Sequence, residues 1–261
     1  MFYLYIALTF IITCLGTVSG ISGGTILKPF MDLAGGYNAA QIGVLAGCAV
    51  FTMSFISFIR NIGAKRLQPA GALGLGFGAV AGGFAGQLLL KTLIANTGGT
   101  RVQLCQNIIL GLLLLGVLAH TFLIKNPKTL SLRHNAAFFT AGIFMGLAAA
   151  FLSIGGGPIN MPILMLLFGM DIKNAAIHSL LIILFAQGAK LLTVLATDGL
   201  AAFNLLPLLP LMAAAAVAGS LLGAALNKKL NPRGVKILFA VMLAAVLGVV
   251  GFNIANFARA L

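Results

Sequence analysis

Two short stretches of the chain decide its fold. Residues 22–36 read SGGTILKPFMDLAGG, and residues 155–170 read GGGPINMPILMLLFGM. Each begins with a glycine cluster and carries a proline several residues later. At a shift of 133 residues, Pro29 falls on Pro162. Two further matches occur at nearby shifts: Asn38-Ala39-Ala40 with Asn174-Ala175-Ala176, and Gly82-x-x-x-Gly86 with Gly219-x-x-x-Gly223. The chain therefore contains one sequence unit twice.

Long apolar runs surround these stretches. Each has about the 20 residues that a membrane helix needs. They lie at about 2–18, 40–59, 69–90, 102–124, 135–154, 174–196, 200–226 and 235–257. Hydrophobic residues make up 61% of the chain and charged residues 7%, against roughly 25% charged in a soluble domain. The composition predicts an all-α polytopic protein that uses lipid as its solvent.

The distribution of basic residues predicts the topology. The net charge of +13 lies in breaks between apolar runs, which is typical of cytoplasmic loops and not of a nucleic-acid-binding surface. If the two short stretches do not cross the membrane, Lys and Arg divide seven to eight between its sides. If both cross, they divide eleven to three, and Lys28 and Lys190 lie at membrane depth. The positive-inside rule therefore favours ten spans with both termini outside.

Five spans per unit give the two units opposite topology. We predict repeat 1 at residues 1–124, a cytoplasmic linker at 125–134 and repeat 2 at 135–261. Inverted repeats with paired short segments, broken by glycine and proline, are typical of secondary transporters. The short segments either cross the bilayer fully or re-enter it.

The glycine clusters are candidate substrate-binding sites. A half-helix that begins at such a cluster exposes unpaired amides and the positive end of its dipole, which together attract anions. The alternative is that these glycines only permit close helix packing, as expected for the run from Gly71 to Gly86. The candidates in the two segments are Ser22, Gly23, Gly24, Thr25, Gly155, Gly156, Gly157 and Asn160.

Two lysines and three neutral polar residues extend this candidate site. A cation at membrane depth is functional by default, so Lys28 and Lys190 are candidates. Lys28 can instead snorkel or pair with Asp32, and Lys190 can snorkel toward Asp198. His178 is a candidate carrier of a coupling proton, and Ser179 and Gln187 lie on the same span. For all three, a polar contact between helices is the alternative.

Other classes of function have weaker support. Residues 20–23 read GISG, which matches the nucleophile pattern of intramembrane serine proteases, but the counterpart at 154–157 lacks the serine. The three cysteines lie in separate apolar runs without metal-ligand spacing, and no nucleotide-binding pattern is present. We therefore predict no enzyme activity, no metal and no cofactor. A membrane scaffold without transport activity is a further alternative.

The two glycine-rich boxes, residues 20–29 and 151–162, resemble those of the sulfite exporter TauE/SafE family, also called TSUP permeases. The serine-containing span at 175–180 fits the same pattern, and the resemblance covers both halves. It implies a permease of a bacterial-type plasma membrane that moves sulfite, sulfonates, thiosulfate or other small organic anions, with protons as the expected coupling ion. The chain departs from the usual box at Lys28 and Asn160, where aliphatic residues are more typical, and it has Asn61-Ile62-Gly63 where the family often has an acidic residue.

Overall fold

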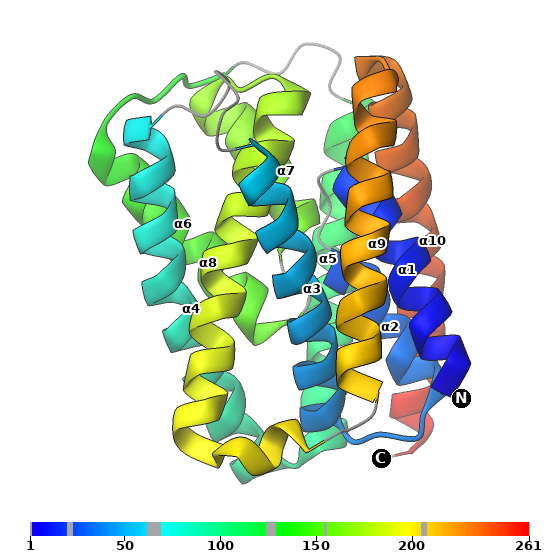
Figure 1. Cartoon of the computed structure of the whole chain (residues 1–261). Coiled ribbons are helices and arrows are strands. Elements are labelled where there is room, and N and C mark those ends of the chain that lie inside the picture. Colours follow the sequence, from blue (N-terminus) through cyan, green and yellow to red (C-terminus); the bar gives the residue numbers. More distant parts are fainter. Residues whose placement is uncertain are drawn as a thin grey trace.

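A computed structural model of the chain contains helices, loops and no strand over the residues that it describes, which are 2–19, 23–61, 69–123, 129–153, 156–204 and 208–260. Figure 1 shows the helices running roughly parallel and antiparallel in one bundle. In chain order they are α1 (Phe2–Ser19), α2 (Gly23–Ala34), α3 (Ala39–Asn61), α4 (Pro69–Thr97), α5 (Gly99–Leu123), α6 (Asn135–Phe151), α7 (Gly157–Phe168), α8 (Ile172–Asp198), the 3₁₀ helix η1 (Leu200–Phe203), α9 (Leu208–Lys229) and α10 (Pro232–Arg259).

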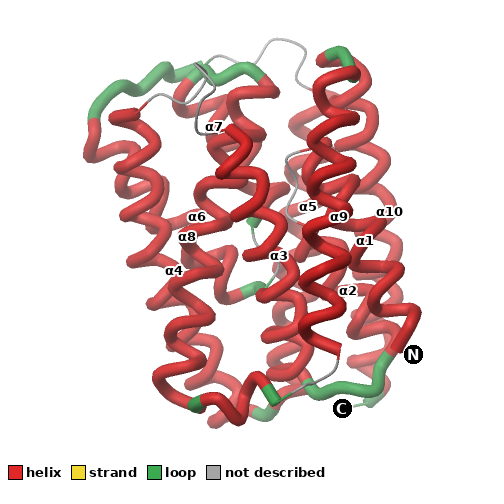
Figure 2. The backbone as a smooth tube through the Cα atoms, viewed as in Figure 1, coloured by secondary structure: helices red, strands yellow, loops and turns green. Residues whose placement is uncertain are grey.

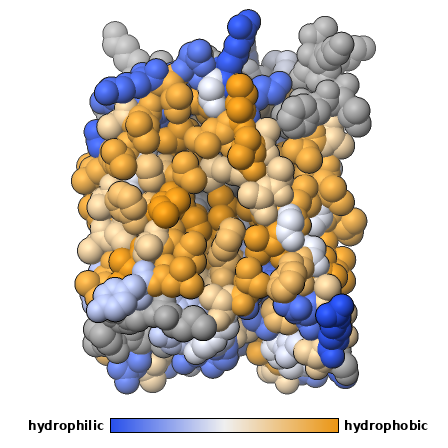
Figure 3. Space-filling model, turned by 90° about the vertical axis from the view of Figure 1, so that its right-hand side faces the viewer, coloured by the Kyte–Doolittle hydropathy of each residue, from blue (hydrophilic) through white to orange (hydrophobic). Residues whose placement is uncertain are grey.

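The lateral surface of the bundle is apolar. Large side chains such as Phe77 and Leu112 are about two-thirds exposed. Exposing so much apolar surface to water costs free energy, whereas contact with lipid does not. Figure 3 shows an apolar belt between two more hydrophilic ends. Within the described residues, six helices are long and apolar enough to cross a membrane, namely α3, α4, α5, α8, α9 and α10, and α1, α6 and α7 are shorter apolar helices. The prediction of a polytopic helical membrane protein is confirmed, and the count of ten spans stays a prediction.

The two stretches that decide the fold form the short helices α2 and α7. Each has 12 residues and is therefore about 18 Å long, against roughly 30 Å for the hydrocarbon core. Both begin in the interior, since Gly23, Gly24 and Thr25 are buried in α2, and Gly157 and Pro158 in α7. Figure 2 shows non-helical backbone, drawn in green, inside the bundle between α6 and α7. The helices α2 and α7 are therefore half-helices. α1 begins and α2 ends at the same end of the molecule (Figure 1).

Helices from opposite halves of the chain pack closely. α4 lies against α6, and α1 against α9, and both contacts depend on glycine. A β-carbon on Gly82 would overlap the backbone carbonyl of Ile143, and one on Gly223 would overlap the carbonyl of Cys14. The packing interpretation of the glycine run in α4 therefore fits the structure, because small residues let two backbones approach each other in a membrane.

One substitution tests this packing. Gly82→Ala places a methyl group against the α6 backbone, and such overpacking costs about 1–3 kcal/mol. We expect a lower unfolding temperature, measured in detergent with a thiol-reactive dye. Gly116→Ala in α5 is the matched control, because no atom lies within 4 Å of the added carbon. Equal unfolding temperatures for the two variants would contradict the close contact.

One expected element differs from the structure. The apolar run at 200–226 was expected to form a single span, but residues 200–203 form the separate helix η1, and α9 begins at Leu208. Gly199, at φ 66°, ends α8 in a left-handed conformation that glycine adopts without strain. Pro207 and Pro210 in the sequence disfavour a continuous helix here.

Candidate functional site

A cavity of about 440 Å³ lies between α2, α3, α4, α5, α8 and η1. Its floor holds three buried polar side chains, those of Lys28, Ser153 and Lys190. Its mouth holds Lys91 and Asp198, whose side chains are 44% and 43% exposed. These two residues lie near the ends of α4 and α8, at the end of the molecule where α1 begins and α10 ends (Figure 1). The cavity therefore opens toward that end.

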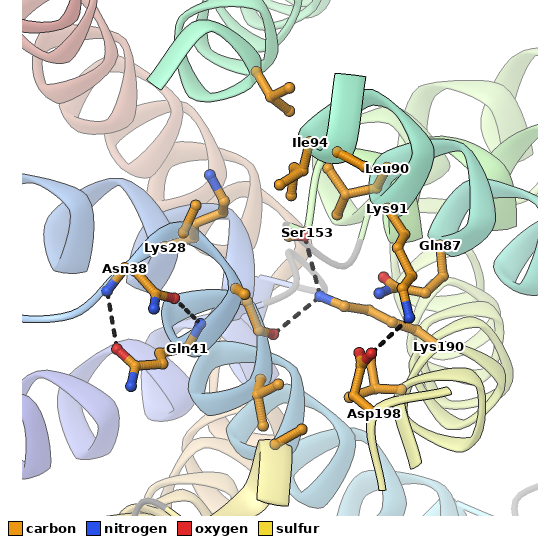
Figure 4. A pocket seen from close by; sticks show the side chains of 18 of the residues that line it. Lys28, Asn38, Gln41, Gln87, Leu90, Lys91, Ile94, Ser153, Lys190 and Asp198 are labelled. Carbon is orange, nitrogen blue, oxygen red and sulfur yellow. Dashed lines mark hydrogen bonds and ion pairs between the residues drawn. The ribbon is translucent and has the colours of Figure 1, made fainter. Parts of the chain in front are cut away.

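Lys190 is the most deeply buried group of the floor, with 1% of the residue exposed. Its ammonium donates hydrogen bonds to the carbonyl oxygen of Gly43 at 3.0 Å and to Oγ of Ser153 at 3.1 Å (Figure 4). Both acceptors are neutral. The side chain comes from α8 and reaches α3 and the break before α7, so it joins both halves of the chain.

No side-chain carboxylate neutralises Lys190. The chain has only three acidic residues, and the structure describes all three. Asp32 pairs with Lys28 at 3.1 Å, and Asp198 pairs with Lys91 at 2.6 Å. Asp171 accepts from the backbone N–H groups of the first turn of α8. Burying an unpaired charge is costly, so this ammonium favours an anion in the cavity beside it.

Lys28 has its own counter-ion. Lys28 and Asp32 lie one turn apart on α2, and their side chains are 4% and 0% exposed. Nε2 of Gln103 on α5 donates to the second oxygen of Asp32 at 3.2 Å. Asn253 on α10 also holds α2, by donating to the carbonyl of Pro29 at 3.0 Å. Lys28 therefore lines the cavity, but its ion pair with Asp32 adds no net charge there.

The chain between α6 and α7 has an unusual backbone beside the floor. Ser153 has a φ of 55°, which is uncommon for a residue with a side chain, and Gly156 caps α7 at φ 75°. In the first turn of α7, the amide of Asn160 is fully buried, and neither its oxygen nor its nitrogen has a partner among the described residues. An unsatisfied amide at a helix N-terminus is suited to bind an anion.

The predicted site residues differ in whether they line the cavity. Lys28 and Lys190 line the cavity. Gly23, Gly24, Thr25, Gly156, Gly157 and Asn160 are buried around the starts of the half-helices and do not line it. Their role in binding stays a prediction. Ser22 and Gly155 lie outside the described residues, as does most of the GISG motif, residues 20–22.

The remaining three candidates lie on the buried face of α8. Nδ1 of His178 is 2.9 Å from the carbonyl of Asn174, which can only accept, so Nδ1 donates and Nε2 keeps a free lone pair. Nε2 has no partner among the described residues. Gln187 lies one turn before Lys190, facing Gly47, and its amide oxygen is likewise unpaired there. Ser179 is fully buried.

Sequence reasoning missed several residues of the cavity. Ser153 was inside the second glycine-rich box, and its place before the helix break was the available signal. Gln87, Gln106 and the Lys91–Asp198 pair also line the cavity. Gly43 contributes only a carbonyl, 147 residues from Lys190, so no local pattern predicts it.

Two comparisons with known proteins both point to membrane transport proteins. Residues 5–250 match the family model described as sulfite exporter TauE/SafE. The chain is 24% identical to a probable membrane transporter protein of Methanocaldococcus jannaschii, over 95% of this chain and 93% of that protein. No solved structure matches.

Proposed function

Because the chain belongs to the sulfite exporter TauE/SafE family, we propose that it is a secondary transporter for small sulfur-containing or organic anions, which bind at the floor of the cavity. The observation that carries the proposal is the ammonium of Lys190, which is buried, faces the cavity and has no carboxylate partner. A bound oxyanion supplies the missing charge and accepts charge-assisted hydrogen bonds.

The start of α7 supports the same site. Ser153, which contacts Lys190, lies only three residues before Gly156, the N-cap of α7. An anion that leaves the cavity floor in this direction meets the positive end of the helix dipole and the unpaired amide of Asn160. The proposed transport path therefore runs from Lys190 to the half-helix start.

The proposed coupling ion is the proton, and His178 is its proposed carrier. A buried imidazole with one free lone pair can accept a proton and release it. The proposed orientation places the linker at 125–134 in the cytoplasm and both termini outside, in a plasma membrane. Single cysteines at Ser131 and Thr97 should then be labelled from inside and from outside respectively, and labelling of both from one side would contradict this orientation.

Flux into proteoliposomes tests transport itself. We expect purified protein to accelerate the uptake of an anion such as methanesulfonate, and an inward proton gradient to accelerate it further. His178→Gln keeps a polar group but carries no proton, so it should keep exchange of the anion and lose the response to the gradient. If no anion among sulfite, thiosulfate, sulfonates and carboxylates is taken up, the protein is not a transporter of this class.

A further inference from the structure

We infer that the substrate of this cavity is an organic monoanion with a short apolar substituent, rather than an inorganic dianion. The inference rests on the proposed function, because it concerns the anion that Lys190 binds. Two features of the cavity carry it: its net charge and the chemistry of its walls.

Among the described residues that line it, the cavity has one uncompensated positive charge. Of its three lysines, Lys28 and Lys91 are each paired with an aspartate, which leaves Lys190 alone. One anionic charge therefore neutralises the site. A dianion gains about twice the attraction to Lys190, but its desolvation cost rises with the square of the charge, so it costs about four times as much to bury. The balance favours a single charge.

Apart from the buried amides of Gln87 and Gln106, the walls between floor and mouth are mostly apolar. Val44 on α3, Leu90 and Ile94 on α4, Val102 on α5 and Val194 on α8 all line the cavity. Figure 4 shows Leu90 and Ile94 in the same view as the floor residues Ser153 and Lys190. A path for a fully hydrated inorganic ion has no need for such walls, whereas an apolar substituent gains free energy by contacting them.

The size of the cavity points the same way. The cavity, at about 440 Å³, is large enough to hold many water molecules. An oxyanion of four or five heavy atoms displaces only a few of them and leaves the apolar walls wet. An anion with its head on Lys190 and its substituent directed to the mouth covers those walls as well.

A homologous series of alkanesulfonates measures the contribution of the walls. We would titrate methane-, ethane-, propane- and butanesulfonate into the protein in lipid nanodiscs by calorimetry. All four remain monoanions across the usable pH range, so only chain length changes. Each buried methylene is expected to strengthen binding about fourfold. Ile94→Thr keeps the β-branched shape but adds a hydroxyl, so it should flatten the dependence on chain length.

Ethane-1,2-disulfonate measures the contribution of charge. It resembles ethanesulfonate but carries a second charge, and we expect it to bind at least tenfold more weakly. Titration of empty nanodiscs corrects for partition of the sulfonates into lipid, and nanodiscs that contain Lys190→Met show whether binding requires Lys190. Equal affinity along the alkyl series, or a disulfonate that binds as tightly as ethanesulfonate, would overturn the inference. In either case the proposed anion site would stand if Lys190→Met still abolished or weakened binding. If the anions bound equally well without Lys190, the proposed function would be overturned instead.

Discussion

Replacing Lys190 by methionine is expected to weaken anion binding roughly 10- to 100-fold while the protein keeps its fold. Among the described cations of the cavity, Lys190 alone has no aspartate partner, so in the variant a bound anion loses its main charge-assisted contact. Such contacts are worth ~1.5–3 kcal/mol, and each ~1.4 kcal/mol is a factor of ten in affinity. Methionine follows the same path as the lysine stem and removes a buried charge, so the unfolding temperature should stay unchanged or rise.

Calorimetry in nanodiscs with propanesulfonate provides the measurement, and Lys173→Met is the matched control. Lys173 lies on the same helix, but its ammonium binds the carbonyl of Leu230, away from the cavity. The control should bind the anion as the parent protein does. A well-folded Lys190→Met variant with parental affinity would show that the floor of the cavity does not bind the anion.

Lys28→Met is expected to have its largest effect on stability. The carboxylate of Asp32 is fully buried, and removing its partner leaves it with only the amide of Gln103 and no opposite charge. Breaking a buried ion pair on one side costs about 3–5 kcal/mol. We expect the apparent unfolding temperature to fall by on the order of 10 °C. A dye that reacts with thiols, including that of the buried Cys14, reports the transition.

The double variant Lys28→Met/Asp32→Asn identifies the cause. It removes both charges and keeps an amide that Gln103 can contact, so most of the lost stability should return. If the single variant is as stable as the parent, or if the added Asp32→Asn restores nothing, the ion pair is not what stabilises α2. Anion binding by the stable double variant then tests the predicted role of Lys28 at the site without interference from misfolding.

Most of the helical layout could be predicted from hydropathy. The runs at 40–59 and 235–257 appear as α3 and α10 with boundaries that differ by a few residues, and the two broken stretches appear as α2 and α7. These elements depend on local composition, which the chain displays directly. The separation of η1 from α9 within the run at 200–226 was missed because prolines inside an apolar run are compatible with either a kink or a stop.

The cavity was less predictable, for a physical reason. The Lys28–Asp32 pair has the i, i+4 spacing that a helix brings together, so the sequence already allowed it. The isolation of Lys190 does not follow from any spacing. It requires that Asp198 pair with Lys91, 107 residues away, and that a bend at Ser153 bring its hydroxyl to the ammonium. Long-range packing decides such contacts.

The glycine contacts between α4 and α6 and between α1 and α9 have a consequence for biosynthesis. The ribosome completes α1 and α4 long before their partners, because α6 and α9 both follow residue 134. During that interval Gly78, Gly82 and Gly86 lack the α6 backbone against which they pack in the finished bundle. We therefore expect the first half to remain an incomplete insertion intermediate until α6 and α9 enter the bilayer. A chain cut within the linker should yield two fragments that regain a stable bundle only when they are made together.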